Sequence, residues 1–153
     1  MTRKLGIIMD PIEHIKIVKD SSFAMMLAAQ RRGWELHYMN QHHLYSDGGS
    51  TRAQTQTLKV QDEPESWFYV ISTQDIALSE LDAVLMRKDP PFDIEYITTT
   101  WLLDSAERAG VVVVNKPASL RDANEKLFIT RFPQCCVPML VSSESSRIRH
   151  FIA

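Results

Sequence analysis

The sequence predicts an α/β fold with a mainly parallel sheet and an antiparallel hairpin extension. Three observations favour it. Apolar runs without polar alternation, at residues 5–9 and 111–114, are typical of strands buried on both faces of a parallel sheet. A helical pattern follows the first run, and another precedes the second. Between them, residues 43–71 carry more polar strand patterns around a glycine turn, which indicates antiparallel strands inserted in the chain between the parallel ones.

Composition bounds the class of protein. The chain has 153 residues, 44% hydrophobic and 24% charged, which suits one globular domain of typical size. A net charge of −2 argues against a nucleic-acid partner, and no apolar run approaches the roughly 20 residues of a membrane span. The two cysteines, Cys135 and Cys136, are adjacent, which favours neither a disulfide nor a zinc site. A cytoplasmic location is the simplest fit.

A strand–helix–strand unit opens the chain. Residues 5–9 predict the first strand, and residues 12–19 predict a loop. Residues 20–22 offer N-cap candidates for a helix that ends near Gly33. Residues 34–39 alternate between apolar and polar side chains and predict the second strand.

Polar strand patterns follow. Residues 46–50 predict a turn between two strands, of which residues 51–60 form a half-exposed one, and residues 67–71 predict a further strand. His42 and His43 would point to opposite faces in an extended chain. They are therefore poor partners in one metal site, and surface positions are favoured over ligation.

The second half repeats the parallel pattern. Residues 83–86 predict a buried strand, residues 93–110 a helix, and the four valines of residues 111–114 a buried central strand. Capping-box spacing within residues 119–125 predicts a helix that begins there, carries Leu127, Phe128 and Ile129 and ends at Pro133. Near the end of the chain, residues 145–152 suit another helix.

The predicted parallel strands end in polar residues at Asp10, at residues 87–89 and at residues 115–117. Carboxyl ends of parallel strands share one edge, where ligands bind in open α/β sheets. We therefore expect a charged cleft for a small ligand, although a solvated, proline-stiffened connection also explains residues 87–91. The turn at Asp10 lacks the closely spaced glycines of a dinucleotide site, so we expect neither NAD nor FAD there.

Five sequence blocks stand in order along the chain: KLGIIMDP at residues 4–11, KDSSFAM at 19–25, QRRGWELHYM at 30–39, MRKDPPFD at 86–93 and NKPASLRDANEKLF at 115–128. Together these blocks resemble the bacterial glutathione synthetase family. After these blocks the likeness thins. Five blocks in the right order are a specific signal, because chance agreement at one short motif would not produce them.

The resemblance implies a ligase of the ATP-grasp class that uses ATP and Mg²⁺. Such enzymes activate γ-glutamylcysteine as an acyl phosphate, which glycine attacks to give glutathione, ADP and phosphate. The implied fold is a Rossmann-like, pre-ATP-grasp domain over residues 1–122, on the substrate side, and a truncated start of the ATP-grasp domain over residues 123–153. The implied partners are these small molecules, and the implied assembly is a homo-oligomer.

Site residues follow in part from the resemblance. Lys126 matches a position that contacts nucleotide phosphates, whereas without the resemblance a solvated helix residue would be favoured. Arg87 and Asp89 are candidates for binding the amino-acid end of γ-glutamylcysteine. Arg87 would pair with its carboxylate through two hydrogen bonds, and Asp89 would contact its ammonium group. An internal pair between these two residues is an equal alternative. Asp10 and Ser22 are further substrate candidates, with helix capping the favoured role of Ser22.

Family members are about twice as long as this chain. Their glycine-rich lid, metal ligands and substrate-binding arginines are expected beyond Ala153, so we expect these residues alone to be inactive. No catalytic nucleophile or base is expected, because nucleotide, metal and positioning perform this chemistry. The alternative is a non-catalytic, stand-alone binding or interaction module derived from this domain, with a tail after Pro133 that is poorly ordered until a partner covers it.

Overall fold

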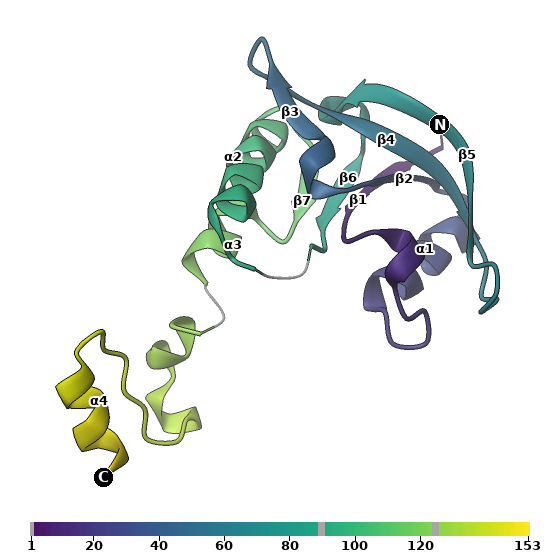
Figure 1. The fold of residues 1–153 in the computed structure, drawn as a ribbon. Helices are drawn as coiled ribbons and strands as arrows, with labels where there is room; N and C mark the ends of the chain where they lie inside the picture. Colours follow the sequence, from purple (N-terminus) through teal and green to yellow (C-terminus); the bar gives the residue numbers. More distant parts are fainter. Residues whose placement is uncertain (1, 89–90, 124–125) are drawn as a thin grey trace.

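The computed structural model describes residues 2–88, 91–123 and 126–153, and shows a curled, mixed seven-stranded sheet with helices on both faces (Figure 1). The strands are β1 (Lys4–Ile8), β2 (Glu35–Met39), β3 (Leu44–Asp47), β4 (Ser50–Val60), β5 (Phe68–Ala77), β6 (Ala83–Met86) and β7 (Val112–Val114). The helices are α1 (Ser21–Arg31), α2 (Ile94–Arg108), α3 (Pro117–Asp122) and α4 (Ser145–Ile152), with the short 3₁₀ helices η1 (Ile12–His14), η2 (Gln41–His43), η3 (Leu78–Glu80), η4 (Phe128–Arg131) and η5 (Pro133–Cys135).

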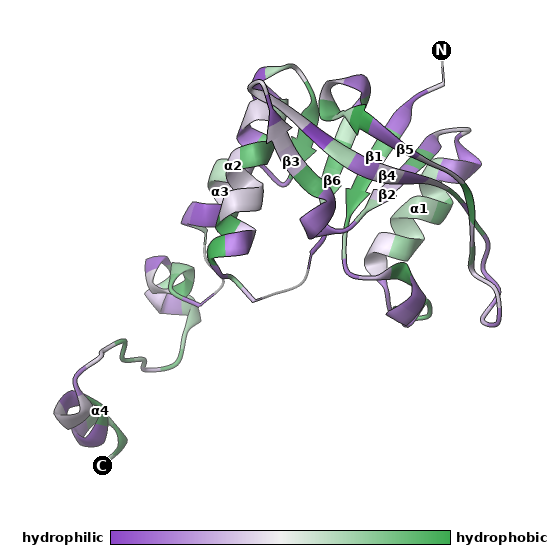
Figure 2. Ribbon diagram, turned by 45° about the horizontal axis from the view of Figure 1, so that its top comes forward, coloured by the Kyte–Doolittle hydropathy of each residue, from purple (hydrophilic) through white to green (hydrophobic). Residues whose placement is uncertain are grey.

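The strand order β3-β4-β2-β1-β6-β7 has β1 at the centre of a parallel group, since β1 pairs in parallel with β2 and β6, and β6 with β7. Alternate side chains of β1 enter two different cores. Ile7 lies in the core that contains Phe23 of α1, and Ile8 in the core that contains Leu103 of α2. The mixed α/β fold and a first strand buried on both faces are therefore confirmed, and Figure 2 shows the hydrophobic colouring of β1 and β6.

The antiparallel extension is present but longer than predicted. β4 pairs antiparallel with β2, β3 and β5. The expected strand at residues 67–71 continues to Ala77, because Ser72 to Asp75 pair with residues along β4. These polar residues gave no strand signal in the sequence, and the long antiparallel partner supplies their hydrogen bonds instead.

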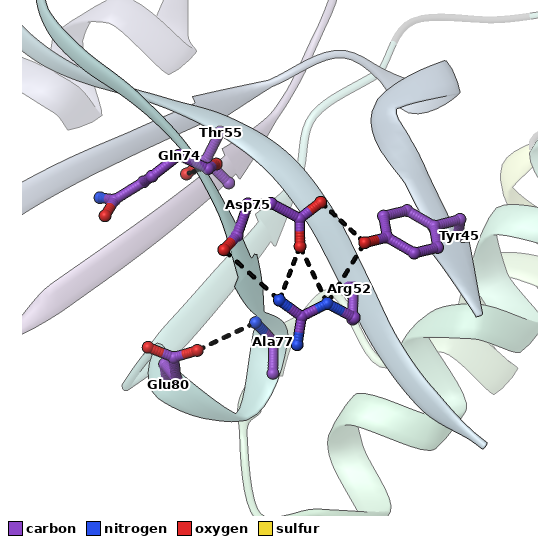
Figure 3. A network of polar contacts seen from close by, with 7 residues as sticks. All are labelled: Tyr45, Arg52, Thr55, Gln74, Asp75, Ala77 and Glu80. Carbon is purple, nitrogen blue, oxygen red and sulfur yellow. Dashed lines mark hydrogen bonds and ion pairs between the residues drawn. The ribbon is translucent and has the colours of Figure 1, made fainter. Parts of the chain in front are cut away.

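Exposed polar side chains join the hairpin strands (Figure 3). The Tyr45 hydroxyl of β3 donates to Asp75 of β5 at 2.7 Å, and Arg52 of β4 pairs with the same carboxylate at 2.6 Å. The Tyr45 hydrogen bond, followed by that from Arg52, holds the pKa of Asp75 below its ordinary value. Side chains of three neighbouring strands, β3, β4 and β5, thus meet at the Asp75 carboxylate.

The prediction of a buried central strand at residues 111–114 was wrong. Among the described strands, β7 pairs with β6 alone and lies at the edge of the sheet. Val113 is buried on the α2 side, whereas Val112 and Val114 are 58% and 43% exposed. Four valines predict a strand, but which faces are covered depends on neighbours that a local pattern does not contain.

The predicted helix ending at Pro133 was also wrong. α3 begins earlier, with Pro117 at its first position, where a missing N–H costs nothing, and it ends at Asp122. Phe128 to Arg131 form the 3₁₀ helix η4 instead. The helix expected near the end of the chain is confirmed as α4, which stands apart from the sheet in Figure 1. In the described part of the chain, no helix has the length and apolar character needed to cross a membrane.

Candidate functional site: a cleft at the carboxyl edge of the sheet

The expected meeting of polar strand ends is confirmed. β1, β6 and β7 run parallel, so their carboxyl ends share one edge of the sheet. There the backbone N–H of Arg87 donates to the Ile8 carbonyl at 2.7 Å, which fixes the chain after β6 beside the chain after β1. Lys88 Nζ consequently lies 2.9 Å from Asp10 Oδ1 in an ion pair across the two strand ends.

Arg87 is oriented by hydroxyl groups of α1. Its Nε donates to Ser22 Oγ at 3.1 Å and its Nη2 to Ser21 Oγ at 2.7 Å. The favoured capping role of Ser22 was wrong, because Asp20 caps α1 by accepting a hydrogen bond from Phe23 N at 2.8 Å. Buried Ser22 thus helps to position the arginine predicted for substrate binding.

Asn40 holds the first strand end in place. Its Nδ2 donates to the Met9 carbonyl at 2.9 Å and to the Tyr38 hydroxyl at 2.8 Å. The same hydroxyl accepts from Ile12 N at 3.2 Å. Burial raises the pKa of Tyr38, so the phenol stays neutral and the backbone on both sides of Asp10 is fixed without adding charge.

Three pockets line this edge. The first, of about 420 Å³, we call the basic pocket; it is lined by Lys16, Lys19, Ser21, Ser22, Arg87 and Asp10, among others. The second, of about 280 Å³, we call the middle pocket; its lining includes Asp10, Asn40, His42, Lys88, Asp93 and Glu95. Asp10 belongs to both pockets, so the two are neighbours across the end of β1.

A larger pocket of about 630 Å³ lies at the other end of the edge, beside β7, α2 and α3. This apolar pocket is lined by Phe92, Tyr96, Val113, Val114, Leu120 and Ala123, with Lys88, Asn115, Lys116 and Ser119 as its polar groups. The rings of Phe92 and Tyr96 contact each other in a tilted arrangement, with their centroids 5.4 Å apart. Because Lys88 also lines the middle pocket, the three pockets follow one another along the edge.

The predicted site residues are only partly brought together. Arg87, Ser22 and Asp10 line the basic pocket, whereas Lys126 is exposed in a turn after α3 and lines none of the three pockets. Asp89 lies outside the described residues, so its predicted pairing stays a prediction.

Several pocket residues were missed. Lys16 and Lys19 were assigned only to a loop of mixed charge; the available signal was their position in the connection between β1 and α1, which begins at the cleft edge. Phe92 and Tyr96 are four residues apart, the spacing that places side chains on one face at a helix start. Val113 and Val114 gave no functional signal, because their role depends on the adjacent α3.

The pattern of sequence blocks agrees with a comparison with known families. A family model described as prokaryotic glutathione synthetase, N-terminal domain, matches residues 3–121. The chain belongs to the prokaryotic glutathione synthetase family. The matched residues contain all seven strands and the whole of the cleft edge up to Leu120.

Curated relatives named glutathione synthetase agree with this membership. The relative from Pseudomonas syringae pv. tomato is 58% identical over 99% of this chain and 47% of its own length. The relative from Pseudomonas putida is 56% identical over 100% of this chain and 48% of its own length. The relative from Vibrio vulnificus is 54% identical over 99% of this chain and 48% of its own length. The chain thus spans about half the length of the glutathione synthetases that it matches.

The described residues hold no cluster of metal-binding side chains. Within residues 2–88, 91–123 and 126–153, no group of three or more His, Cys, Asp or Glu side chains is placed to hold a metal ion. His42 and His43 are neighbours in η2, with ring centroids 4.3 Å apart, and His43 Nδ1 accepts from Asn40 N at 3.2 Å. The part of the chain that the structure describes therefore offers no ready-made set of three side-chain ligands for Mg²⁺.

Proposed function

We propose that this chain is the substrate-side part of a glutathione synthetase and that its carboxyl-edge cleft binds γ-glutamylcysteine. One observation carries the proposal: a domain of this family places Asp10, Lys88 and Arg87 at the adjoining ends of parallel strands, where they line connected pockets. Both charge signs are needed for a ligand that has an ammonium group and carboxylates.

The reaction proposed for the full-length enzyme has two steps. A carboxylate oxygen of γ-glutamylcysteine attacks the γ-phosphorus of ATP, which forms the acyl phosphate and releases ADP. The amine of glycine then attacks the acyl carbon, the amide forms, and phosphate and a proton leave. Here the cleft residues bind and orient the dipeptide, and such positioning lowers the barrier to a reaction between bound molecules.

Within this proposal, residues 1–122 form the substrate-side domain and residues 123–153 begin the nucleotide-binding one. All strands and both hydrophobic cores belong to the first segment, and no described residue after Ala123 is buried. Lys126, just after α3, is assigned to the nucleotide phosphates by the family resemblance. The ligands for Mg²⁺ are assigned to the half of the relatives that this chain does not span.

Calorimetry with γ-glutamylcysteine and with Mg-ATP, beside an assay for ADP release, tests the proposal. We expect the dipeptide to bind and no ADP to form, because the described residues contain no group of three or more side chains that could hold a metal ion. Failure of the dipeptide to bind would refute the proposed site. ADP release dependent on dipeptide and glycine would instead contradict the assignment of essential groups to the other half of the relatives.

A further inference from the structure

Two adjacent thiols lie outside the cleft. Cys135 and Cys136 are the two cysteines of the chain, and both are free thiols. Cys135 is exposed, and Cys136 is half-buried. Neither residue lines any of the three pockets along the sheet edge. A role for this pair is therefore independent of the proposed function.

A hydrogen-bonded turn holds the two cysteines. The backbone N–H of Cys135 donates to the Phe132 carbonyl at 2.9 Å, and that of Cys136 donates to the Pro133 carbonyl at 3.3 Å. The Cys136 thiol donates to the Ile129 carbonyl at 3.7 Å, and a thiol is a weak donor. The turn is thus held by its backbone, so the Cys136 sulfur can exchange its hydrogen bond for a covalent partner at little cost.

The sequence around the thiols is basic. Residues 126–143 contain Lys126 and Arg131 and no Asp or Glu. Cysteines that react with electrophiles typically lie in partly exposed, electropositive surroundings, because the thiolate is the nucleophile. The pair therefore has no neighbouring carboxylate in the sequence that would repel a thiolate, and each thiol is at least partly accessible from solvent.

Adjacency determines what the two sulfurs can hold together. Consecutive Cα atoms are about 3.8 Å apart, whereas disulfides usually join Cα atoms about 4.4–6.8 Å apart, so a direct bond between these sulfurs would be strained. An atom inserted between the two sulfurs separates them and removes this restriction. Zinc is unsuited to this position, because it takes four ligands and the described residues supply no group of three or more His, Cys, Asp or Glu side chains.

We propose that Cys135 and Cys136 form a chelating site for compounds of trivalent arsenic. Arsenic is soft and favours sulfur, as the ions that select thiolates do. It needs only two protein ligands, because it keeps a third bond to its own substituent. Its two bonds to sulfur form a bent arrangement that adjacent residues can supply, whereas a two-coordinate ion such as Cu(I) or Hg(II) prefers its sulfurs on opposite sides.

Binding is a condensation without a change of oxidation state. Each sulfur attacks the arsenic atom of an arsenoxide, R–As=O, so that two S–As bonds form and the As=O bond breaks. The two thiol protons leave with the oxygen as one water molecule. The product is a ring that contains the arsenic, both sulfurs and the backbone between Cys135 and Cys136.

Titration of the full 153-residue chain with phenylarsine oxide tests the site, with thiols counted colorimetrically and adducts by intact-mass spectrometry. One equivalent should consume both thiols and give one adduct per chain. Release of the probe by 2-mercaptoethanol should need a concentration at least about a hundredfold higher than for a chain with one cysteine, because the second bond forms at the high effective concentration of an adjacent group. Ethane-1,2-dithiol, which is itself a chelator, should release the probe readily.

The variants Cys135→Ser and Cys136→Ser each keep one thiol, so each should lose the probe at a low concentration of 2-mercaptoethanol. Labelling of each variant with one N-ethylmaleimide checks that the remaining thiol is accessible, and circular dichroism checks the fold. Gln134→Ser, at an exposed neighbouring position in η5, is the matched control and should retain the probe as the wild type does.

The site is overturned if the wild type takes two adducts per chain, or if free thiols remain after one equivalent. It is also overturned if the wild type and the single-cysteine variants release the probe at the same concentration of 2-mercaptoethanol. The test uses neither dipeptide nor nucleotide, so its outcome does not depend on the proposed function.

Discussion

Replacing Arg121 with alanine should lower the free energy of unfolding, because this side chain fastens α3 to α2. Arg121 Nη2 lies 2.8 Å from Asp104 Oδ2, and its Nη1 donates to Thr100 Oγ1 at 2.9 Å. Arg121 and Asp104 are each 22% exposed, so the pair is neither fully solvated nor fully buried. Leu120, which lines the apolar pocket, is the next residue and depends on the same helix placement.

The expected magnitude lies between two limits. Solvated ion pairs contribute about 0–1 kcal/mol, whereas removal of one partner of a buried pair costs about 3–5 kcal/mol. At this exposure, water can partly solvate the remaining Asp104 carboxylate, so we expect a loss of about 2 kcal/mol. With a urea dependence of about 2 kcal/mol per molar, the unfolding midpoint should fall by about 1 M.

Urea unfolding of Arg121→Ala, Asp104→Ala and the double variant forms a double-mutant cycle. We expect a coupling energy of about 1 kcal/mol, since the charged groups contact one another directly. The pair of Arg147 and Glu144, in and before α4, is a matched control with 70% and 57% exposed side chains, and its removal should leave the midpoint unchanged. Additive effects of the two substitutions would refute the conclusion that the Arg121–Asp104 ion pair holds α3 against α2.

Two further predictions concern the sheet. Gly6→Ala should cost about 1–3 kcal/mol by urea unfolding, because a Cβ would lie 2.8 Å from Leu81 Cδ1 and 3.1 Å from Val84 Cγ2; an unchanged midpoint would show that the core adapts without cost. Burial, which outweighs the Glu35 hydrogen bond, holds the pKa of His37 below its ordinary 6.5. The unfolded chain therefore binds this proton more readily than the folded chain, so the free energy of unfolding should fall as the pH is lowered through 6.5, and less steeply in His37→Gln; equal slopes would contradict this.

Elements with strong local signals were predictable. The Asp20 cap and the glycine stop gave α1 to within two residues at each end, since capping uses side chains next to the helix in sequence. The apolar run at residues 5–9 indicated burial on both faces because no face was polar. The shared edge of the strand ends followed from parallel pairing alone.

Features that depend on distant neighbours were not predictable. The edge position of β7 is set by the absence of a further described partner strand beyond it, which four valines do not encode. The continuation of β5 to Ala77 depends on the length of β4. Ser22 matched a cap pattern, but Asp20 took that role and left the Ser22 hydroxyl to accept from Arg87. Lys16 and Lys19 line the basic pocket because the loop before α1 lies beside Ser21, Ser22 and Arg87, an arrangement that a local sequence pattern does not contain.

The fold and the proposed binding depend on different atoms at the cleft. The strand ends are positioned by the backbone contact of Arg87 with Ile8 and by Asn40, contacts that need neither a carboxylate nor an ammonium group. The charged side chains are partly exposed, with Asp10 at 42%, and exposed pairs add at most about 1 kcal/mol to stability. These charges therefore contribute little to the free energy of unfolding, and a ligand of complementary charge explains their presence better. Substitutions of these side chains should consequently separate affinity from stability, which substitutions in β1 cannot do.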